Sequence, residues 1–212
     1  MTELIRIKIC GITRKEDALL ASKLGAWAVG FIFVKNTPRY ISPENAAEII
    51  EILPRNIEKI GVFADISLEK INNIAIETKI TKIQLHGKES PEFCENLAKL
   101  TGKEIIKAIR VKSEDDLKLI TQYKDKVSFV LLDSYCENNL GGTGKIFDWE
   151  IAKKAKEYGI PIILAGGLNP DNAKQAYEIV KPYALDISSG VEVSKGIKDP
   201  EKLRKLFTLN LQ

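Results

Sequence analysis

PIILAGGLNPDNAKQAYEIVKPYALDIS, residues 161 to 188, contains a strand, a helix and a second strand in succession. PIILA is a short apolar run that is followed by two glycines. The next segment, PDNAKQAYEIV, spaces its apolar residues three and four apart, as one face of a helix does, and we expect this helix to begin at Pro170. ALDIS is another short apolar run. This order predicts two parallel strands joined by a right-handed helical crossover.

The same alternation extends along the whole chain of 212 residues. Eight short apolar or β-branched runs occur, at residues 5–9, 28–34, 59–63, 82–85, 104–109, 129–133, 161–165 and 184–188. The segments between them have helical spacing, and no linker divides the chain. We therefore predict an α/β protein with a single domain over residues 1–212, an eight-stranded (β/α) TIM barrel. The alternative is a doubly wound open sheet, but Cys10-Gly11-Ile12-Thr13 stands where that fold has its Gly-x-Gly-x-x-Gly turn.

The composition is that of a globular protein, with 44% apolar and 29% charged residues. No apolar run approaches the roughly 20 residues of a membrane span, and MTELIRIKIC lacks the features of a signal peptide, so we expect a cytoplasmic protein without a membrane partner. The three cysteines, Cys10, Cys94 and Cys136, are odd in number and include no close pair. This pattern argues against a disulfide framework and against a zinc site.

The charges further limit the possible chemistry. The 32 basic and 29 acidic residues nearly balance at a net charge of +3, and no basic block predicts a nucleic-acid partner. His86 is the single histidine, which excludes a cluster of histidine metal ligands, and we expect no metal site. Acid-base chemistry would therefore depend mainly on Cys, Asp, Glu or Lys side chains.

Polar residues at the carboxyl ends of the predicted strands are the candidate site residues, because catalytic groups of TIM barrels lie at that face. They are Lys8, Cys10, Gln84, His86, Arg110, Asp133 and Asp186. Cys10 is either a buried core thiol or a reacting group. Asp133 is either a site carboxylate or a structural aspartate that caps a helix or forms a salt bridge. Lys8 is either an ion-pair partner or a cation that promotes the Cys10 thiolate, and His86 is a site residue or a structural histidine.

Two glycine-containing loops predict a phosphate site. Gly166 and Gly167 follow the seventh strand, and Ser188, Ser189 and Gly190 follow the eighth. In this fold the loops after these two strands, with the start of a short extra helix, commonly bind phosphate through backbone N–H groups. The alternative is that both are merely tight turns.

Two connections are long enough to cover a site, residues 34–45 and residues 134–148. The second contains Gly142 and Gly144, which we predict to be part of a lid loop. Its GGTGK segment is not a nucleotide P-loop, because it lacks the first glycine of that motif and a hydroxyl residue after Lys145.

Several motifs together resemble the phosphoribosylanthranilate isomerase family of tryptophan biosynthesis. The resemblance extends in order from Lys8 to Asp199. The segments that carry it are KICGIT, VGFIFV, TPRYIS, IGVFAD, IQLHG, LLDS, GGTGKIFDW, ILAGGLNPDN, DISSGVE and KGIKD. It implies a single-domain barrel that uses neither a metal nor an organic cofactor. It also implies an Amadori rearrangement of N-(5'-phosphoribosyl)anthranilate to 1-(2-carboxyphenylamino)-1-deoxyribulose 5-phosphate, a small phosphorylated substrate.

The resemblance also implies roles for individual residues. Cys10, in the K-x-C-G motif, matches the family's general base, and Asp133, in the L-L-D-S motif, matches its general acid. Arg39, in the P-R-Y motif, matches the anchor of the anthranilate carboxylate. We also expect Lys8, Gln84, His86 and Asp186 to contact the substrate, while Cys136 has no assigned role.

Acid-base chemistry by these two groups makes demands on their surroundings. A cysteine base must lose its proton more easily than a free thiol, for which Lys8 is the candidate cation. An aspartate acid must retain its proton, for which we expect Asp133 to be buried.

Two other interpretations remain open at this point. The first is the related aminoaldose isomerase of histidine biosynthesis, or an enzyme that serves both pathways. That relative has aspartates at the first-strand and sixth-strand positions, so Cys10 argues against it. The second is a catalytically silent phosphate-binding barrel, which would be expected to lack the acid or the base. The sequence is compatible with a monomer or a homodimer.

Overall fold

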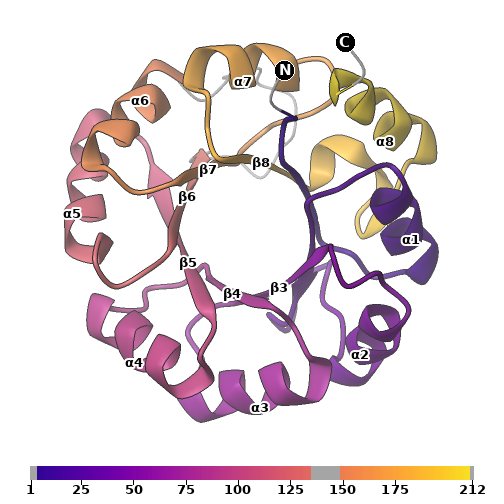
Figure 1. Cartoon of the computed structure of the whole chain (residues 1–212), viewed down its shortest axis with the longest axis horizontal. Helices are drawn as coiled ribbons and strands as arrows, with labels where there is room; N and C mark the ends of the chain where they lie inside the picture. The colour runs from indigo at the N-terminus through magenta and orange to yellow at the C-terminus, as the bar shows by residue number, and fades with distance from the viewer. Residues whose placement is uncertain (1–3, 135–148, 211–212) are drawn as a thin grey trace.

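Eight parallel strands close into a barrel that is surrounded by a ring of helices (Figure 1). The structure, a computed structural model, describes residues 4–134 and 149–210. Each strand pairs in parallel with the next one, and β1 (Ile7–Cys10) also pairs with β8 (Ala184–Ile187), which closes the barrel. The predicted TIM barrel is therefore confirmed, and the open sheet is excluded because it would leave these two strands unpaired.

The other barrel strands lie near the predicted runs. They are β2 (Ala28–Ile32), β3 (Glu58–Phe63), β4 (Lys82–Leu85), β5 (Glu104–Val111), β6 (Phe129–Ser134) and β7 (Ile162–Leu164). The helices are α1 (Lys15–Lys23), α2 (Pro43–Glu51), α3 (Leu68–Thr78), α4 (Pro91–Thr101), α5 (Ile120–Tyr123), α6 (Trp149–Lys154), α7 (Ala173–Val180) and α8 (Pro200–Phe207). Across residues 4–134 and 149–210, no helix has the length and apolar character needed to cross a membrane.

Shorter elements complete the described chain. Four of them are 3₁₀ turns: η1 (Glu114–Leu119), η2 (Ala155–Tyr158), η3 (Ser189–Val191) and η4 (Thr208–Asn210). A small antiparallel hairpin after the eighth strand consists of β9 (Glu192–Ser194) and β10 (Ile197–Lys198), and the sequence patterns did not predict it.

Several helices begin where the sequence provides a cap. Ser42, Ser67 and Ser90 precede α2, α3 and α4, and each hydroxyl accepts a hydrogen bond from the backbone N–H three residues later. Such a cap is typically worth about 1 kcal/mol. Helix α7 is different, because it begins at Ala173 and not at Pro170 as predicted. Asn169 and Asn172 explain the delay, since Asn172 Oδ1 accepts from Asn169 N and Asn169 Oδ1 accepts from Asp171 N, both at 2.8 Å.

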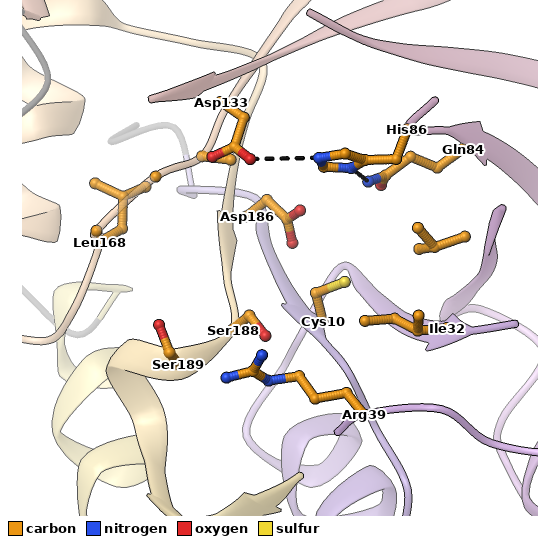
Figure 2. A pocket seen from close by; sticks show the side chains of 14 residues that line it. Cys10, Ile32, Arg39, Gln84, His86, Asp133, Leu168, Asp186, Ser188 and Ser189 are labelled. Carbon is orange, nitrogen blue, oxygen red and sulfur yellow. Dashed lines mark hydrogen bonds and ion pairs between the residues drawn. The ribbon is translucent and has the colours of Figure 1, made fainter. Parts of the chain in front are cut away.

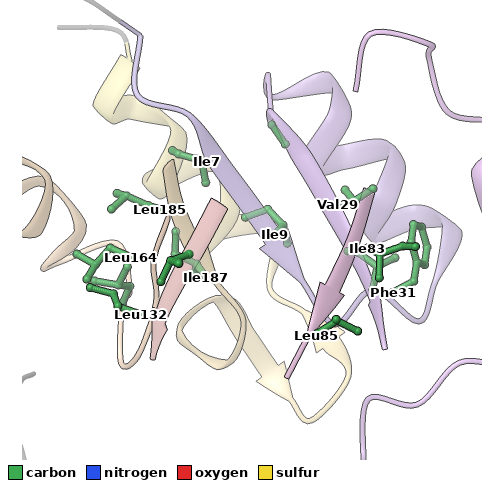
Figure 3. Packing of buried hydrophobic residues seen from close by; sticks show 14 of the residues in the cluster. Ile7, Ile9, Val29, Phe31, Ile83, Leu85, Leu132, Leu164, Leu185 and Ile187 are labelled. Atoms are coloured by element: carbon green, nitrogen blue, oxygen red, sulfur yellow. The ribbon is translucent and has the colours of Figure 1, made fainter. Parts of the chain in front are cut away.

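The two faces of each strand have different roles. Figure 3 shows outward-facing side chains such as Ile7, Ile9, Leu185 and Ile187, which belong to the main core cluster that also contains the buried helix residues. A second cluster, formed by Ala28, Ile60, Ile106, Ala108, Phe129, Leu131, Ile163, Ala165 and Ala184, fills the interior of the barrel. Strand side chains alternate between the two faces of the sheet, so the residues between the outward-facing ones point into the barrel. This alternation directs the candidate residues of the strands into one space.

Candidate active site

A cavity of about 280 Å³ opens at the carboxyl ends of the strands (Figure 2). Its lining residues are Cys10, Ile32, Arg39, Val62, Gln84, His86, Asp133, Ala165, Gly166, Gly167, Leu168, Asp186, Ser188 and Ser189. Most of the predicted site residues are therefore brought together. Lys8 and Gly190 lie next to the cavity without lining it. Gly142, Gly144 and Cys136 lie outside the described residues.

Cys10 is the last residue of β1 and is buried at 6% exposure. It pairs in register with Gly30 of β2, and a Cβ added to Gly30 would lie 2.8 Å from Cys10 Sγ. Real Cβ atoms do not approach another heavy atom so closely, so this glycine provides the space for the thiol. The sequence did not identify Gly30 as a neighbour of the site, because the register of two strands is not visible in either one alone.

Burial raises the pKa of the Cys10 thiol above its ordinary value. Lys8 and Lys198 act in the opposite direction, because each positive charge favours the thiolate, while the Asp186 carboxylate disfavours it. The expectation that Lys8 favours the thiolate is thus correct in direction, but desolvation outweighs it in the open site. A raised pKa means that the Cys10 thiol holds its proton to a higher pH than a free cysteine does.

Lys8 is fully buried in the barrel interior below the cavity. Its ammonium donates to Gln84 Oε1 and to Asp186 Oδ2, each at 2.8 Å. Burial disfavours the charged form of Lys8, but the neighbouring Asp186 carboxylate, together with an interaction with Cys10, outweighs this effect and raises the pKa of Lys8. Asp186 Oδ1 is also buried and has no hydrogen-bond partner among the described residues. This oxygen belongs to a residue that lines the cavity, so a hydroxyl of a ligand is a suitable donor for it.

A chain of hydrogen bonds leads from Lys8 to Asp133. Because Lys8 only donates, its bond to Gln84 Oε1 directs the amide Nε2 of Gln84 toward His86 Nδ1, 3.2 Å away. Nδ1 then accepts, which places the proton of a neutral imidazole on Nε2. His86 Nε2 lies 3.3 Å from Asp133 Oδ2, and Figure 2 shows this contact at the side of the cavity opposite Arg39. His86 is therefore suited to orient the Asp133 carboxyl group.

The expected burial of Asp133 is not found in the described structure. Asp133 is the last residue but one of β6, and its side chain is 30% exposed and lines the cavity. It points into the barrel, as Leu131 two residues earlier does. Arg110 is opposite Asp133 in the β5–β6 register, but it lines a neighbouring cavity with His86.

Arg39 reaches the cavity from the loop between β2 and α2. Its Nε and Nη2 donate to Glu192 Oε1 and Oε2 at 2.8 and 2.7 Å, a bidentate pair, and its side chain is 21% exposed. The Arg39 side chain lies against the backbone of Gly11. Gly11 has a φ of +75°, and a Cβ added to it would lie 2.6 Å from Arg39 Cδ. Only glycine satisfies both requirements at this turn.

The predicted phosphate loops lie side by side at the cavity. Gly166 and Gly167 have positive φ angles of 88° and 65°, and within the described chain neither backbone N–H group donates a hydrogen bond. Gly190 allows the two loops to lie in contact, because a Cβ at this position would lie only 1.9 Å from Leu168 O. The short extra helix expected here is the single 3₁₀ turn η3, which begins at Ser189. The free N–H groups and the cavity are suitable for an anion.

Sequence reasoning missed two charged residues at this site. Glu192 and Lys198 are buried, one on each strand of the β9–β10 hairpin, and they contact Arg39, Cys10 and Ser188 of the site. The sequence does contain a weak indication of both residues. Glu192 stands between Val191 and Val193, and Lys198 follows Ile197, so each charged residue adjoins apolar ones. In the ranges 4–134 and 149–210 there is no group of three or more His, Cys, Asp or Glu side chains that could hold a metal ion.

Comparisons with known proteins show which family this chain resembles in sequence and fold. Residues 7–208 match the family model described as N-(5'phosphoribosyl)anthranilate (PRA) isomerase. An N-(5'-phosphoribosyl)anthranilate isomerase of Citrifermentans bemidjiense is 48% identical over 202 residues, which cover 95% of each chain. The crystal structure of phosphoribosyl anthranilate isomerase from Thermotoga maritima superposes with a TM-score of 0.91 at 38% identity and covers 98% of this chain and 99% of that one.

A further solved structure contains a ligand. It is a phosphoribosyl anthranilate isomerase in complex with reduced 1-(o-carboxyphenylamino)-1-deoxyribulose 5-phosphate, at a TM-score of 0.88 and 36% identity, and covers 98% of this chain and 99% of that one.

Proposed function

The chain belongs to the N-(5'-phosphoribosyl)anthranilate isomerase family, and on this basis we propose that Cys10 is the general base and Asp133 the general acid of its reaction. It is an isomerase of tryptophan biosynthesis that converts N-(5'-phosphoribosyl)anthranilate to 1-(2-carboxyphenylamino)-1-deoxyribulose 5-phosphate. The observation that supports the two roles most directly is that the thiol and the carboxyl group line one cavity at the ends of β1 and β6.

The proposed reaction moves only protons and electron pairs within the substrate. Asp133 donates a proton to the ribose ring oxygen, the bond from C1' to this oxygen breaks, and the nitrogen lone pair forms a protonated Schiff base. The Cys10 thiolate then removes the C2' proton, and the electron pair of that bond forms the C1'–C2' double bond of an enolamine. Loss of the C2' hydroxyl proton and protonation of C1' give the ketone. No electron leaves the substrate, so the chemistry requires only an acid and a base.

Other polar groups of the cavity are suited to hold the sugar. We propose that Asp186 Oδ1, which is buried without a partner in the described chain, accepts a hydrogen bond from a ribose hydroxyl. Gln84 and His86 border the same space and keep Asp133 oriented. Lys8 acts from below through its contacts with Asp186 and Gln84.

Arg39 is proposed to bind the anthranilate carboxylate. A planar guanidinium matches a carboxylate in a way that a lysine ammonium does not. Arg39→Lys should therefore raise KM by about tenfold or more, the equivalent of about 1.4 kcal/mol of lost binding, while the protein stays folded. Steady-state kinetics with a thermal melt on the same samples measures both. An unchanged KM and turnover number would remove Arg39 from the site.

We propose that the substrate phosphate binds at Gly166, Gly167, Ser188, Ser189 and Gly190, mainly through backbone N–H groups. A crystal grown with sulfate, or with the product, should then contain the anion or the product phosphate between these loops. Anion density that repeatedly lies at the opposite end of the barrel would contradict this assignment.

The experiment that separates the remaining interpretations is a turnover assay of the purified chain with two substrates. N-(5'-phosphoribosyl)anthranilate should be converted, and the aminoaldose substrate of histidine biosynthesis should not. A silent phosphate-binding barrel would convert neither substrate. The cytoplasmic location, the single domain over residues 1–212 and the monomeric or dimeric state stay predictions.

A further inference from the structure

Glu192 is a buried carboxylate that contacts two cations. Its side chain is 5% exposed, and it accepts both hydrogen bonds of the Arg39 fork. Oε1 also accepts from Lys198 Nζ at 3.0 Å and from Gly196 N at 3.3 Å. Two cations therefore share one buried carboxylate beside the cavity. We call Arg39, Glu192 and Lys198 the hairpin cluster.

Lys198 completes the cluster from the second strand of the hairpin. Its side chain is fully buried, and besides Glu192 its ammonium donates to Cys10 O at 2.6 Å and to Ser188 O at 3.1 Å. These acceptors use all the donors of the ammonium group. Its backbone is also held, because Lys198 N donates to Asp17 Oδ2 of α1 at 3.0 Å.

The contacts of Lys198 begin where the strand pairing ends. The last residues paired between β1 and β8 are Ile9 and Ile187. The carbonyl groups of the residues that follow, Cys10 and Ser188, lie beyond the paired part of these two strands. The Lys198 ammonium bonds to both and extends the connection by one step. One side chain therefore links the carbonyl of the proposed base to the first residue of the proposed phosphate loop.

We propose that Glu192 and Lys198 are positioning residues for the isomerase reaction. Glu192 orients Arg39, so that the remaining N–H groups of the guanidinium face the substrate carboxylate. Lys198 fixes the backbone of Cys10 relative to the Ser188 loop, so that the base and the phosphate site keep their spacing. This inference rests on the proposed roles of Cys10 and Arg39.

Burial energetics support a role beyond stability. Removing an ion pair from water is costly, and apolar residues of similar volume often stabilise a fold equally well. Glu192 and Lys198 instead contact residues of the site directly: the Glu192 carboxylate pairs with Arg39, and the Lys198 ammonium donates to the carbonyls of Cys10 and Ser188. The positive charge of Lys198 also favours the Cys10 thiolate. The cluster therefore combines placement with electrostatic support.

Glu192→Gln tests the part of the proposal that concerns Arg39. An amide offers one acceptor oxygen and directs an NH₂ group at Arg39 or at Lys198, both of which only donate. We expect KM to rise at least ~10-fold with a smaller change in the turnover number, because the anchor loses its orientation. Glu192→Asp keeps the charge and should recover part of the loss. An unchanged or lower KM for Glu192→Gln would overturn this role.

Lys198→Met tests the part that concerns Cys10. We expect the turnover number to fall at least ~10-fold, since small misplacement of a catalytic group is costly. Alkylation of Cys10 by iodoacetamide, quantified by mass spectrometry of the Cys10 peptide, should need a higher pH than in the wild type, because a cation near the thiol is lost. If Lys198→Met does not fold, Lys198→Gln replaces it. A folded variant with wild-type turnover and an unshifted alkylation profile would overturn the role of Lys198.

Glu89→Gln provides a matched control. Glu89 and Lys107 form another buried ion pair, with side chains 2% and 4% exposed, and Lys107 likewise donates to backbone carbonyls, those of Leu85 and Gly87. Glu89→Gln should lower the melting temperature but keep the wild-type KM. An equal rise of KM in both variants would reduce the hairpin cluster to a structural role. The proposed function fails separately, if the wild-type chain has no turnover or if Cys10→Ser retains it.

Discussion

Cys10→Ser is expected to give a folded protein whose turnover number is at least ~10²-fold below that of the wild type, the lower end of what a positioned base supplies. A serine hydroxyl nearly matches the thiol in size, so the space opposite Gly30 stays filled. The hydroxyl is a far weaker acid, however, and it can hardly form the anion that removes the C2' proton. Single-turnover and steady-state assays of the purified variant measure the loss.

A packing role for Cys10 makes a different prediction. The substitution would then cost about 1 to 3 kcal/mol for a buried hydroxyl without a partner, and activity per folded molecule would survive. Circular dichroism and a thermal melt determine the folded fraction. Near-native turnover of folded Cys10→Ser would return Cys10 to the core and leave the base unassigned.

Asp133→Asn should lower the turnover number by at least ~10²-fold as well, because an amide has no acidic proton for the ring oxygen. The amide oxygen still accepts a hydrogen bond from His86 Nε2, so the orientation of the side chain is preserved. The measurement is turnover of the folded variant, and the control is a substrate analogue that binds to both proteins with similar affinity. A variant that retains most of the activity would show that another group protonates the ring.

The double variant Cys10→Ser/Asp133→Asn distinguishes one mechanism from two independent effects. Groups that act in the same reaction show non-additive losses, so the double variant should retain far more activity than the product of the single losses predicts. A multiplicative loss would mean that the two residues contribute independently.

Local patterns were sufficient to predict the barrel. Short apolar runs such as KIQL and FVLLD indicate strands. Ser42, Ser67 and Ser90 are typical of the residue that precedes a helix. The predicted start of α7 was wrong by three residues. The side-chain oxygens of Asn172 and Asn169 accept hydrogen bonds from the backbone N–H groups of Asn169 and Asp171, and such local bonds compete with helix formation. The β9–β10 hairpin was missed because its strands are too short to establish a period.

The site could be predicted only where the fold rule was enough. Cys10 and Asp133 were identifiable because both end a strand at the face where barrels carry catalysis. The pair of Lys8 with Asp186 joins residues 178 positions apart, and that of Arg39 with Glu192 joins residues 153 apart, so neither has a local signal. The net effect on the Cys10 pKa depends on how burial compares with nearby charges, and a sequence does not contain that comparison.

The bond from Lys198 to the Cys10 carbonyl has a consequence for the order of folding, because it joins positions 188 residues apart. Contacts so distant in sequence form late, since a long loop must first be closed. As the chain leaves the ribosome, the strand that carries Cys10 emerges first, but β8 and the hairpin that contact it emerge near the end, followed among the described elements by α8 and η4. A nascent chain that has not yet reached β8 therefore carries Cys10 as an ordinary thiol, and catalytic competence arrives with the closure of the barrel.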